Sequence, residues 1–304
     1  MFKLSTRRIA LTLVLLTLAA TASAAELRGT WTAEVSDSDP SKLYFQINRR
    51  HSNSGRTVQL STFTGLSTAQ VQSATRQPVL FEQRGEAGFI AFEGTFKEGY
   101  GAGQFTFTPN PTFLEKVRAL GVSTEPNGKH RGRERDLDER LLHYTINDLT
   151  TEFIRSMQAE GYDVSLDEYF SFRIFNITPQ LVRELAALGY RDIDADDLVA
   201  SQIHGVRPEY IRRMTAAGFR DLSLQDLISF RIHGVSGEFV QELRELGYAD
   251  IPGDKLVAMR IHGVTPEFIR EMKAAGYSNI PVDKLIAMRI HGVDAVFVRK
   301  MNGM

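Results

Sequence analysis

The stretch that decides the fold is Ile261-His262-Gly263-Val264-Thr265-Pro266-Glu267-Phe268-Ile269-Arg270-Glu271-Met272-Lys273-Ala274-Ala275-Gly276-Tyr277. Its opening Ile-His-Gly-Val recurs every 29 residues, with histidine and glycine at His204-Gly205, His233-Gly234, His262-Gly263 and His291-Gly292. In the two earlier units the glycine position holds Asn176 and Asp148. Glycine, asparagine and aspartate are the residues that best tolerate a left-handed backbone, so this position predicts a structural turn that ends a helix.

Each repeat contains two short amphipathic segments, which we call the first and second helix of the repeat. In the first helix, Thr265 suits the N-cap, Pro266 suits the first helical position and Gly276 ends the helix. The second helix follows in Ile280–His291, and we expect its Ile290 to face the core together with the leucine and isoleucine at 285 and 286. The repeat is therefore a helical hairpin.

Helices of about ten residues are only marginally stable alone, because nucleation is costly and few hydrogen bonds follow it. Neighbouring hairpins must stabilise them, so residues 111–304 are predicted to form an α-solenoid of six hairpins and a last, single helix. Residues 122–136, rich in glycine, lysine and arginine, interrupt the repeats as a predicted flexible insert.

Residues 25–110 show a different pattern, in which segments of alternating apolar and polar residues are separated by glycines. Six strands are predicted, at Leu27–Val35, Lys42–Arg50, Thr57–Phe63, Val79–Gln83, Phe89–Lys97 and Gly103–Thr108. Short connections favour an antiparallel meander, closed as a small barrel or folded as a sandwich. The predicted fold class is α+β, with this β domain followed by the solenoid.

The first 24 residues have the three parts of a secretory signal peptide. Lys3, Arg7 and Arg8 precede an apolar run, and Ala22-Ser23-Ala24 offers a cleavage site. Cleavage after Ala24 would leave an exported protein, periplasmic or extracellular, with no stable membrane insertion. An uncleaved anchor and twin-arginine export are the alternatives.

Composition excludes several classes of function. The 304 residues include no cysteine, which excludes disulfide scaffolds, cysteine-ligated metals and thiol nucleophiles. The formal net charge of −1 gives no general attraction to nucleic acid. We find no nucleophile elbow, zinc-protease, phosphate-loop or dinucleotide motif. The chain is therefore predicted to be non-enzymatic, with no catalytic residues, no cofactor and no metal.

The four repeat histidines invite a metal interpretation that geometry disfavours. Equivalent side chains of stacked hairpins lie on the order of 10 Å apart, whereas zinc ligands each lie about 2 Å from one ion. A histidine at a helix C-terminus complements the dipole, so capping is the favoured role, and pH sensing or metal binding the alternative.

Arginines form two further ladders along the repeats. The candidates for partner binding are Arg173, Arg231, Arg260 and Arg289, broken at Gln202, together with Arg212 and Arg270. From Asn147 onward there are 18 lysines and arginines against 23 acids, a net charge of −5. Ion pairing between repeats and a groove for an acidic partner are both open. The turn also resembles the helix-hairpin-helix of DNA-binding proteins, but the acidic balance and export argue against nucleic acid.

Trp31, the only tryptophan, is the candidate ligand-binding residue of the β domain. Gly29-Thr30-Trp31 resembles the Gly-x-Trp of lipocalin-like barrels, which implies a ligand cavity; a core position is the alternative.

Gly29-Thr30-Trp31, the stretch Gly101–Asn110 and the repeat pattern Pro-Glu-Phe-Ile-Arg…Gly-Tyr together resemble a bacterial extracytoplasmic module. It is similar to the C-terminal regions of some sensor metallopeptidases of the β-lactamase-regulator type, although the peptidase part is absent here. The resemblance implies a sensing or interaction module, so we expect the repeats to bind a protein or peptide of the cell envelope. A ligand-binding β domain supported by the repeats is the alternative function.

Overall fold

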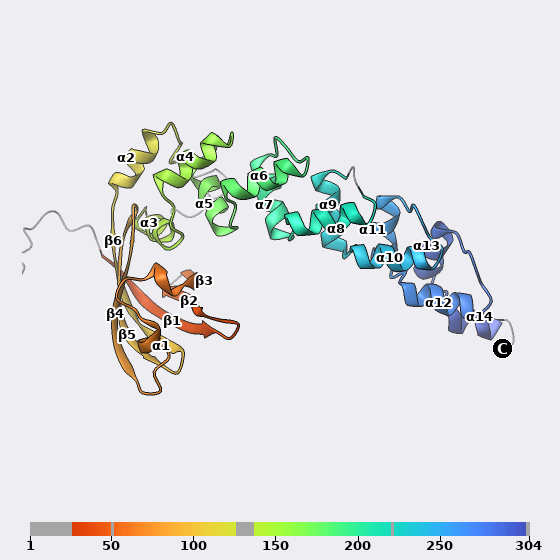
Figure 1. Cartoon of the computed structure of the whole chain (residues 1–304), viewed down its shortest axis with the longest axis horizontal. Coiled ribbons are helices and arrows are strands. Elements are labelled where there is room, and N and C mark those ends of the chain that lie inside the picture. Colours follow the sequence, from red (N-terminus) through yellow and green to blue (C-terminus); the bar gives the residue numbers. More distant parts are fainter. Residues whose placement is uncertain (1–25, 50–51, 126–136, 220–221, 302–304) are drawn as a thin grey trace, which may run out of the picture. The chain divides into compact units, whose positions relative to one another are not determined.

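A computed structural model describes residues 26–49, 52–125, 137–219 and 222–301. The predicted signal peptide lies outside these residues. The chain divides into two compact units (Figure 1): one extends to Arg84 and includes Gly88–Asn110, and the other comprises Gly85–Ala87 and the residues from Pro111 onward. The architecture is α+β, as predicted, with an antiparallel sheet followed by a run of helices.

The first unit contains one antiparallel sheet of six strands, in the order β3-β2-β1-β6-β5-β4. The strands are β1 Leu27–Ser36, β2 Asp39–Arg49, β3 Ser52–Gln59, β4 Gln77–Gly85, β5 Gly88–Lys97 and β6 Tyr100–Pro109. Two three-stranded meanders are thus joined by the pairing of β1 with β6, in which Trp31 lies opposite Gly103.

The sheet curls around a cluster of aromatic side chains. Phe45 on β2 and Phe92 on β5 are three strands apart in the sheet order, which would separate them by about 14 Å in a flat sheet. Their ring centroids lie only 5.3 Å apart. Outside the named strands, Thr64 forms a single bridge with Glu82 of β4. The curvature is what allows one set of rings to fill the concave side.

The third strand differs from the prediction, which placed it at Thr57–Phe63. It begins at Ser52, and Leu60–Thr62 is instead a short 3-10 turn, which places Leu60 and Phe63 in the core. A further turn of helix, α1 (Thr68–Val71), was not predicted. Ser67 and Gln70 form a capping box at its start, and Val71 is buried.

The helical unit follows the predicted repeat closely. The first helices are α2 Thr112–Arg118, α4 Thr151–Ala159, α6 Pro179–Ala187, α8 Pro208–Ala216, α10 Gly237–Glu245, α12 Pro266–Ala274 and α14 Ala295–Met301. The second helices are α3 Leu137–Ile146, α5 Leu166–Ile174, α7 Ala195–Ile203, α9 Leu224–His233, α11 Gly253–Ile261 and α13 Val282–Ile290.

The Ile-His-Gly-Val turn has the backbone geometry that the sequence predicted. The glycine position has positive φ in all six units, including +53° at Asn176 and +51° at Asp148. In each unit the next residue donates its N–H to a carbonyl five residues earlier, as Val235 does to Phe230 at 2.8 Å. This pair of features is the Schellman ending.

Helix starts are less uniform than helix ends. The Thr265 hydroxyl accepts a hydrogen bond from the Phe268 N–H, as predicted. Ser165 and Ser223 form capping boxes at two of the second helices. Asp194 occupies the N-cap position of α7, but its side chain makes no capping hydrogen bond there.

The hairpins pack in two layers of like helices. Second helices α7, α9, α11 and α13 contact one another in succession, and first helices α8, α10, α12 and α14 do the same. Equivalent residues of successive repeats therefore form rows. Of the predicted flexible insert, Val122 and Thr124 are buried and hence belong to the packed structure, while 126–136 lies outside the described residues.

Candidate binding surfaces of the helical repeats

The ladder of Arg173, Arg231, Arg260 and Arg289, which we call the arginine ladder, joins repeats to the ones before them. The Arg231 Nε donates to the carbonyl oxygen of His204 at 3.1 Å, and its guanidinium carbon lies 4.9 Å from the centre of the Tyr210 ring. Arg260 makes the same two contacts with His233, at 3.4 Å, and with Phe239, at 4.9 Å. Each arginine thus caps the C-terminal end of the preceding second helix while it stacks on an aromatic ring of its own repeat.

The two ends of the ladder preserve the stacking contact, and Arg173 preserves the hydrogen bond as well. Arg173 donates to the carbonyl oxygen of Asn147 at 2.9 Å and stacks on Phe153 at 5.1 Å. It also pairs with Asp148 at 3.3 Å. Arg289 stacks on Phe268 at 5.1 Å. These four arginines, proposed from the sequence as partner-binding residues, therefore also pack against neighbouring helices of the solenoid.

Glycine leaves space for the arginine in the turn as well as allowing the backbone conformation. A β-carbon added at Gly205, Gly234 or Gly263 would lie 2.9–3.1 Å from the Nη2 of the following ladder arginine. At Gly292, where no ladder arginine follows within the described residues, the same carbon would meet nothing within 4 Å.

One repeat lacks all three members of this contact at once. Gln202 replaces the arginine, Leu181 replaces the aromatic residue, and Asn176 replaces the glycine. The same repeat buries Ser201 at the position that Phe230 occupies in α9. The joint loss supports the interpretation of the three residues as one interacting set.

The other two candidate arginines are exposed and paired with acids. Arg270 contacts Glu242 of the preceding repeat at 2.8 Å and Glu267 at 3.1 Å. Arg212 lies 3.8 Å from Glu209. Exposed pairs of this kind contribute little to stability, about 0–1 kcal/mol each, which leaves their guanidinium groups open to solvent.

The repeat histidines contribute backbone atoms to the ladder. His204 and His233 supply the carbonyl oxygens that the arginines cap. Between residues 137 and 301, as far as the structure describes them, no hydrogen bond or ion pair involves the four imidazole rings. At these two turns the arginine of the next repeat donates a hydrogen bond to the end of the helix.

Trp31 is a core residue of the sheet. Its side chain is 0% exposed, and its ring lies within 5.5 Å of the ring centres of Phe45, Phe81 and Phe96. The indole N–H donates to the carbonyl oxygens of Glu93 and Gln104. With its faces packed and its donor used, this side chain has the position of a core residue and no free polar group to offer a ligand.

An exposed row of isoleucines is the feature that the sequence analysis missed. We call it the isoleucine row; its side chains are 45–56% exposed and belong to Ile174, Ile203, Ile232, Ile261 and Ile290. The prediction that Ile290 faces the core was wrong. The second helices instead bury the side chain five residues earlier, as α13 does with Leu285, and α9 and α13 also bury the one four residues earlier.

A sequence signal for this exposure exists on the same helix face. Three residues before each isoleucine stands alanine or serine, and seven residues before it stands aspartate or glutamine, as with Ala258 and Asp254 before Ile261. These spacings place all three on one side of a helix. The small and polar residues mark that side as the solvent side.

The neighbours of the row in sequence are basic. An arginine of the ladder precedes Ile174, Ile232, Ile261 and Ile290, and a histidine follows each row isoleucine from Ile203 onward. The arginines at 231, 260 and 289 and the histidines at 204, 262 and 291 are exposed. An apolar row beside cationic groups is suited to a chain that carries apolar and acidic residues.

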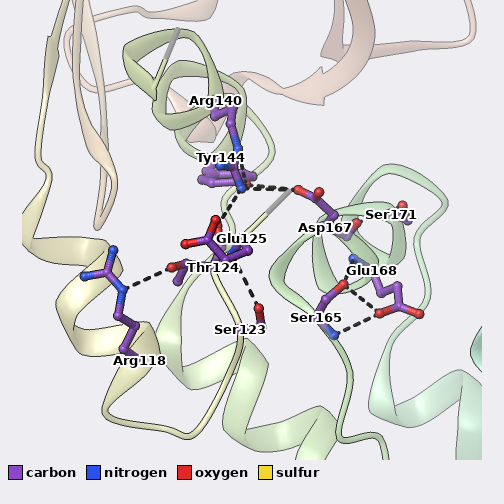
Figure 2. A network of polar contacts seen from close by, with 10 residues as sticks. All are labelled: Arg118, Ser123, Thr124, Glu125, Arg140, Tyr144, Ser165, Asp167, Glu168 and Ser171. Carbon is purple, nitrogen blue, oxygen red and sulfur yellow. Dashed lines mark hydrogen bonds and ion pairs between the residues drawn. The ribbon is translucent and has the colours of Figure 1, made fainter. Parts of the chain in front are cut away.

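A polar network holds the start of the helical unit (Figure 2). The Arg140 Nη2 donates to the carbonyl oxygen of Thr124 at 3.2 Å and to the Tyr144 hydroxyl at 3.0 Å, and it lies 3.4 Å from Asp167. Burial raises the pKa of Tyr144 to about 12, so its hydroxyl stays protonated as a hydrogen-bond donor. The network joins α3 to α5 and to the segment after α2.

Several surface hollows lie at the Gly-Tyr turns that end the first helices. The largest of those we describe is about 520 Å³ and is lined by residues of mixed charge, including Glu160, Arg183 and Asp192. In the described parts of the chain, no group of three or more histidine and acidic side chains is arranged to hold a metal ion. Nor does any described helix combine the length and the apolar character that crossing a membrane requires.

Comparison with protein-family models, with curated proteins and with solved structures finds no significant match.

Proposed function

We propose that this protein is a non-enzymatic, exported interaction protein whose helical repeats bind an extended peptide segment of a cell-envelope partner. The isoleucine row is the observation that carries the proposal. Single exposed apolar residues are common on proteins, but a regular row of them is typical of interaction surfaces.

The spacing of the row matches that of an extended peptide. Packed helices lie about 8–10 Å apart, so isoleucines of successive second helices are expected at that interval. A polyproline II segment rises about 3.1 Å per residue and advances about 9 Å in three residues. An apolar residue at every third position of such a segment would meet one isoleucine per repeat.

Several repeats must act together for useful affinity. Covering the exposed half of one isoleucine contributes on the order of 1 kcal/mol, less than the cost of association. Four or five such contacts, with acidic side chains beside Arg231, Arg260 and His262, give a sufficient total. The resemblance to sensor-protein regions supports the same binding role.

Selection from a displayed library of random 15-residue peptides tests the proposal on the full mature chain. We expect the selected peptides to carry apolar residues at every third position with acidic residues between them. The double variant Ile232→Ser/Ile261→Ser should weaken binding of a selected peptide about tenfold or more, which corresponds to about 1.4 kcal/mol per factor of ten.

The matched control is Leu80→Ser, which removes an exposed apolar side chain from strand β4. This variant should bind the selected peptide like the unaltered chain. Recovery of no enriched peptide, or of peptides that bind the isoleucine variant and the control equally well, would remove the support for the row as a binding surface.

A further inference from the structure

The outer side of helices α13 and α14 is an open copy of a contact that is closed elsewhere in the chain. Phe297 stands 29 residues after Phe268, and its side chain is 49% exposed. The rings at the equivalent positions Phe153, Tyr210, Phe239 and Phe268 are 4–9% exposed. Met301 is likewise exposed where its equivalent, Met272, is fully buried. We call the surface formed by Gly292, Phe297 and Met301 the end face.

The local backbone of the end face is already in the form that the closed contacts have. Gly292 has a φ of +69°, against +71° at Gly263, and the Val293 N–H closes the same Schellman ending onto Met288 at 2.8 Å. The Asp294 carboxylate accepts a hydrogen bond from the Phe297 N–H at 2.8 Å, in the place of the Thr265 cap. The face is therefore preorganised.

In the closed copies these elements receive an arginine. Arg289 lies over Phe268, and its Nη2 is 3.1 Å from where a β-carbon of Gly263 would stand. A β-carbon at Gly292 would meet nothing within 4 Å, so the corresponding space is open among the described residues. The end face thus presents an aromatic ring, a helix C-terminus and an unobstructed glycine, which together suit a guanidinium group.

In three of the closed copies, those of Arg231, Arg260 and Arg289, the helix that supplies the arginine has a simple pattern. A buried leucine stands four residues before the arginine, and a phenylalanine or methionine stands directly before it, as in Leu227-Ile228-Ser229-Phe230-Arg231 and Leu256-Val257-Ala258-Met259-Arg260. We propose that the end face binds, in trans, an amphipathic helix of another protein with the pattern Leu-x-x-(Phe/Met)-Arg. This inference does not depend on the isoleucine row.

A second copy of this chain fits the end face less well. Its ladder arginines Arg173, Arg231, Arg260 and Arg289 already contact rings of their own repeats. Engaging one of them at another molecule would break an existing contact. A helix with a free arginine has no such cost.

The test uses the full mature chain and a fluorescent peptide with the sequence of residues 281–291. A hydrocarbon staple between two solvent-facing positions keeps this peptide helical. Because the staple keeps the peptide helical before it binds, a failure to bind cannot be attributed to the cost of helix nucleation. We expect saturable binding by fluorescence anisotropy. Replacing the peptide arginine with lysine should weaken it about fivefold or more, because lysine lacks the planar group that stacks and donates in two directions.

Two variants of the chain locate the site. Gly292→Asn keeps the left-handed backbone, which asparagine adopts at Asn176, and adds a side chain beside the space where the arginine is expected. It should weaken binding. Gly276→Asn is the matched control, because Gly276 also has positive φ (+92°), meets nothing within 4 Å and lies at the far end of α12. It should bind the peptide normally.

The proposal is overturned if the stapled peptide does not bind, if lysine replaces arginine without loss, or if the two glycine variants bind alike. Sedimentation of the chain alone gives a further check. Self-association that Phe297→Ser abolishes and that excludes the peptide would assign the end face to a second copy instead.

Discussion

The Nε of Arg231 donates to the carbonyl oxygen of His204, 27 residues earlier in the chain, at 3.1 Å. This hydrogen bond joins the end of one hairpin to the second helix of the next. Because the guanidinium also lies on Tyr210, one side chain connects three helices of two repeats. The stability of the solenoid should therefore depend on contacts of this kind more than on surface ion pairs.

Arg231→Ala should lower the free energy of unfolding by about 1–3 kcal/mol, because it removes a charge-assisted hydrogen bond and a stacking contact. Arg212→Ala is the comparison, since its partner Glu209 is an exposed neighbour at 3.8 Å. That variant should cost about 0.5 kcal/mol or less. Urea unfolding followed by helical circular dichroism measures both, and equal losses would contradict the structural role of the ladder.

Alanine substitutions at two glycines distinguish the stability cost of backbone strain from the cost of crowding by a neighbouring side chain. Gly234→Ala places a β-carbon 2.9 Å from Arg260 Nη2 at a φ of +70°, whereas Gly247→Ala, at +95°, meets nothing within 4 Å. Strain alone should cost Gly247→Ala about 1–2 kcal/mol. Gly234→Ala should cost measurably more in the same urea titration. If the two variants lose the same stability, the space beside Gly234 is not what selects glycine there.

The interrupted repeat offers a gain of stability. Restoring the full set with Asn176→Gly, Leu181→Phe and Gln202→Arg should raise the midpoint of thermal unfolding. The new arginine can then stack on the phenylalanine ring and reach the turn that the glycine leaves open. Gln202→Arg alone should help little, since Leu181 gives it no ring and Asn176 occupies the turn. Thermal melts of the single, double and triple variants test this non-additivity. Purely additive effects would argue against a coupled set.

Tyrosine burial gives the helical unit a limit at alkaline pH. Burial raises the pKa of Tyr210 to about 12, above its ordinary value near 10, and its hydroxyl donates to the Val235 carbonyl oxygen at 3.0 Å. The protonated form is thus favoured by folding. Its stabilisation is fully present below pH 10 and is lost as the pH rises through 12.

Tyr210→Phe should lose about 1 kcal/mol at pH 8, with the hydrogen bond, and then decline less than the unaltered chain between pH 10 and pH 12. Tyr44→Phe, at an exposed tyrosine of the sheet, should leave the alkaline profile of the helical signal unchanged. The midpoints of urea unfolding of the unaltered chain and the two variants, measured across this pH range, test this expectation. Parallel decline of all three proteins would show that Tyr210 does not set the alkaline limit.

The elements of the fold were predictable where a few adjacent residues determine the conformation. The left-handed turns at Asp148, Asn176 and Gly205 follow from residue type, and the helix start at Thr265 follows from capping chemistry. The third strand was placed too late, because Leu60 and Phe63 are apolar whether they belong to a strand or to a turn that enters the core.

The candidate surfaces were less predictable, because apolar character does not state which side of a short helix is covered. Ile290 was expected in the core, and the structure shows that Leu285 and Ile286 are covered while Ile290 is not. The ladder arginines were correctly seen as a row. Their partners, a carbonyl 27 residues earlier and a ring in another helix, could not be read from spacing.

By itself, the sequence determined the 29-residue period, the two helices of each repeat and the turns between them, because these depend on interactions within about five residues. The tertiary structure alone decided that the arginines stack on rings of a neighbouring helix, that the isoleucines face solvent and that the sheet curls around Trp31. The physical reason is that burial is a property of neighbours: a side chain is exposed or covered according to segments that lie far from it along the chain.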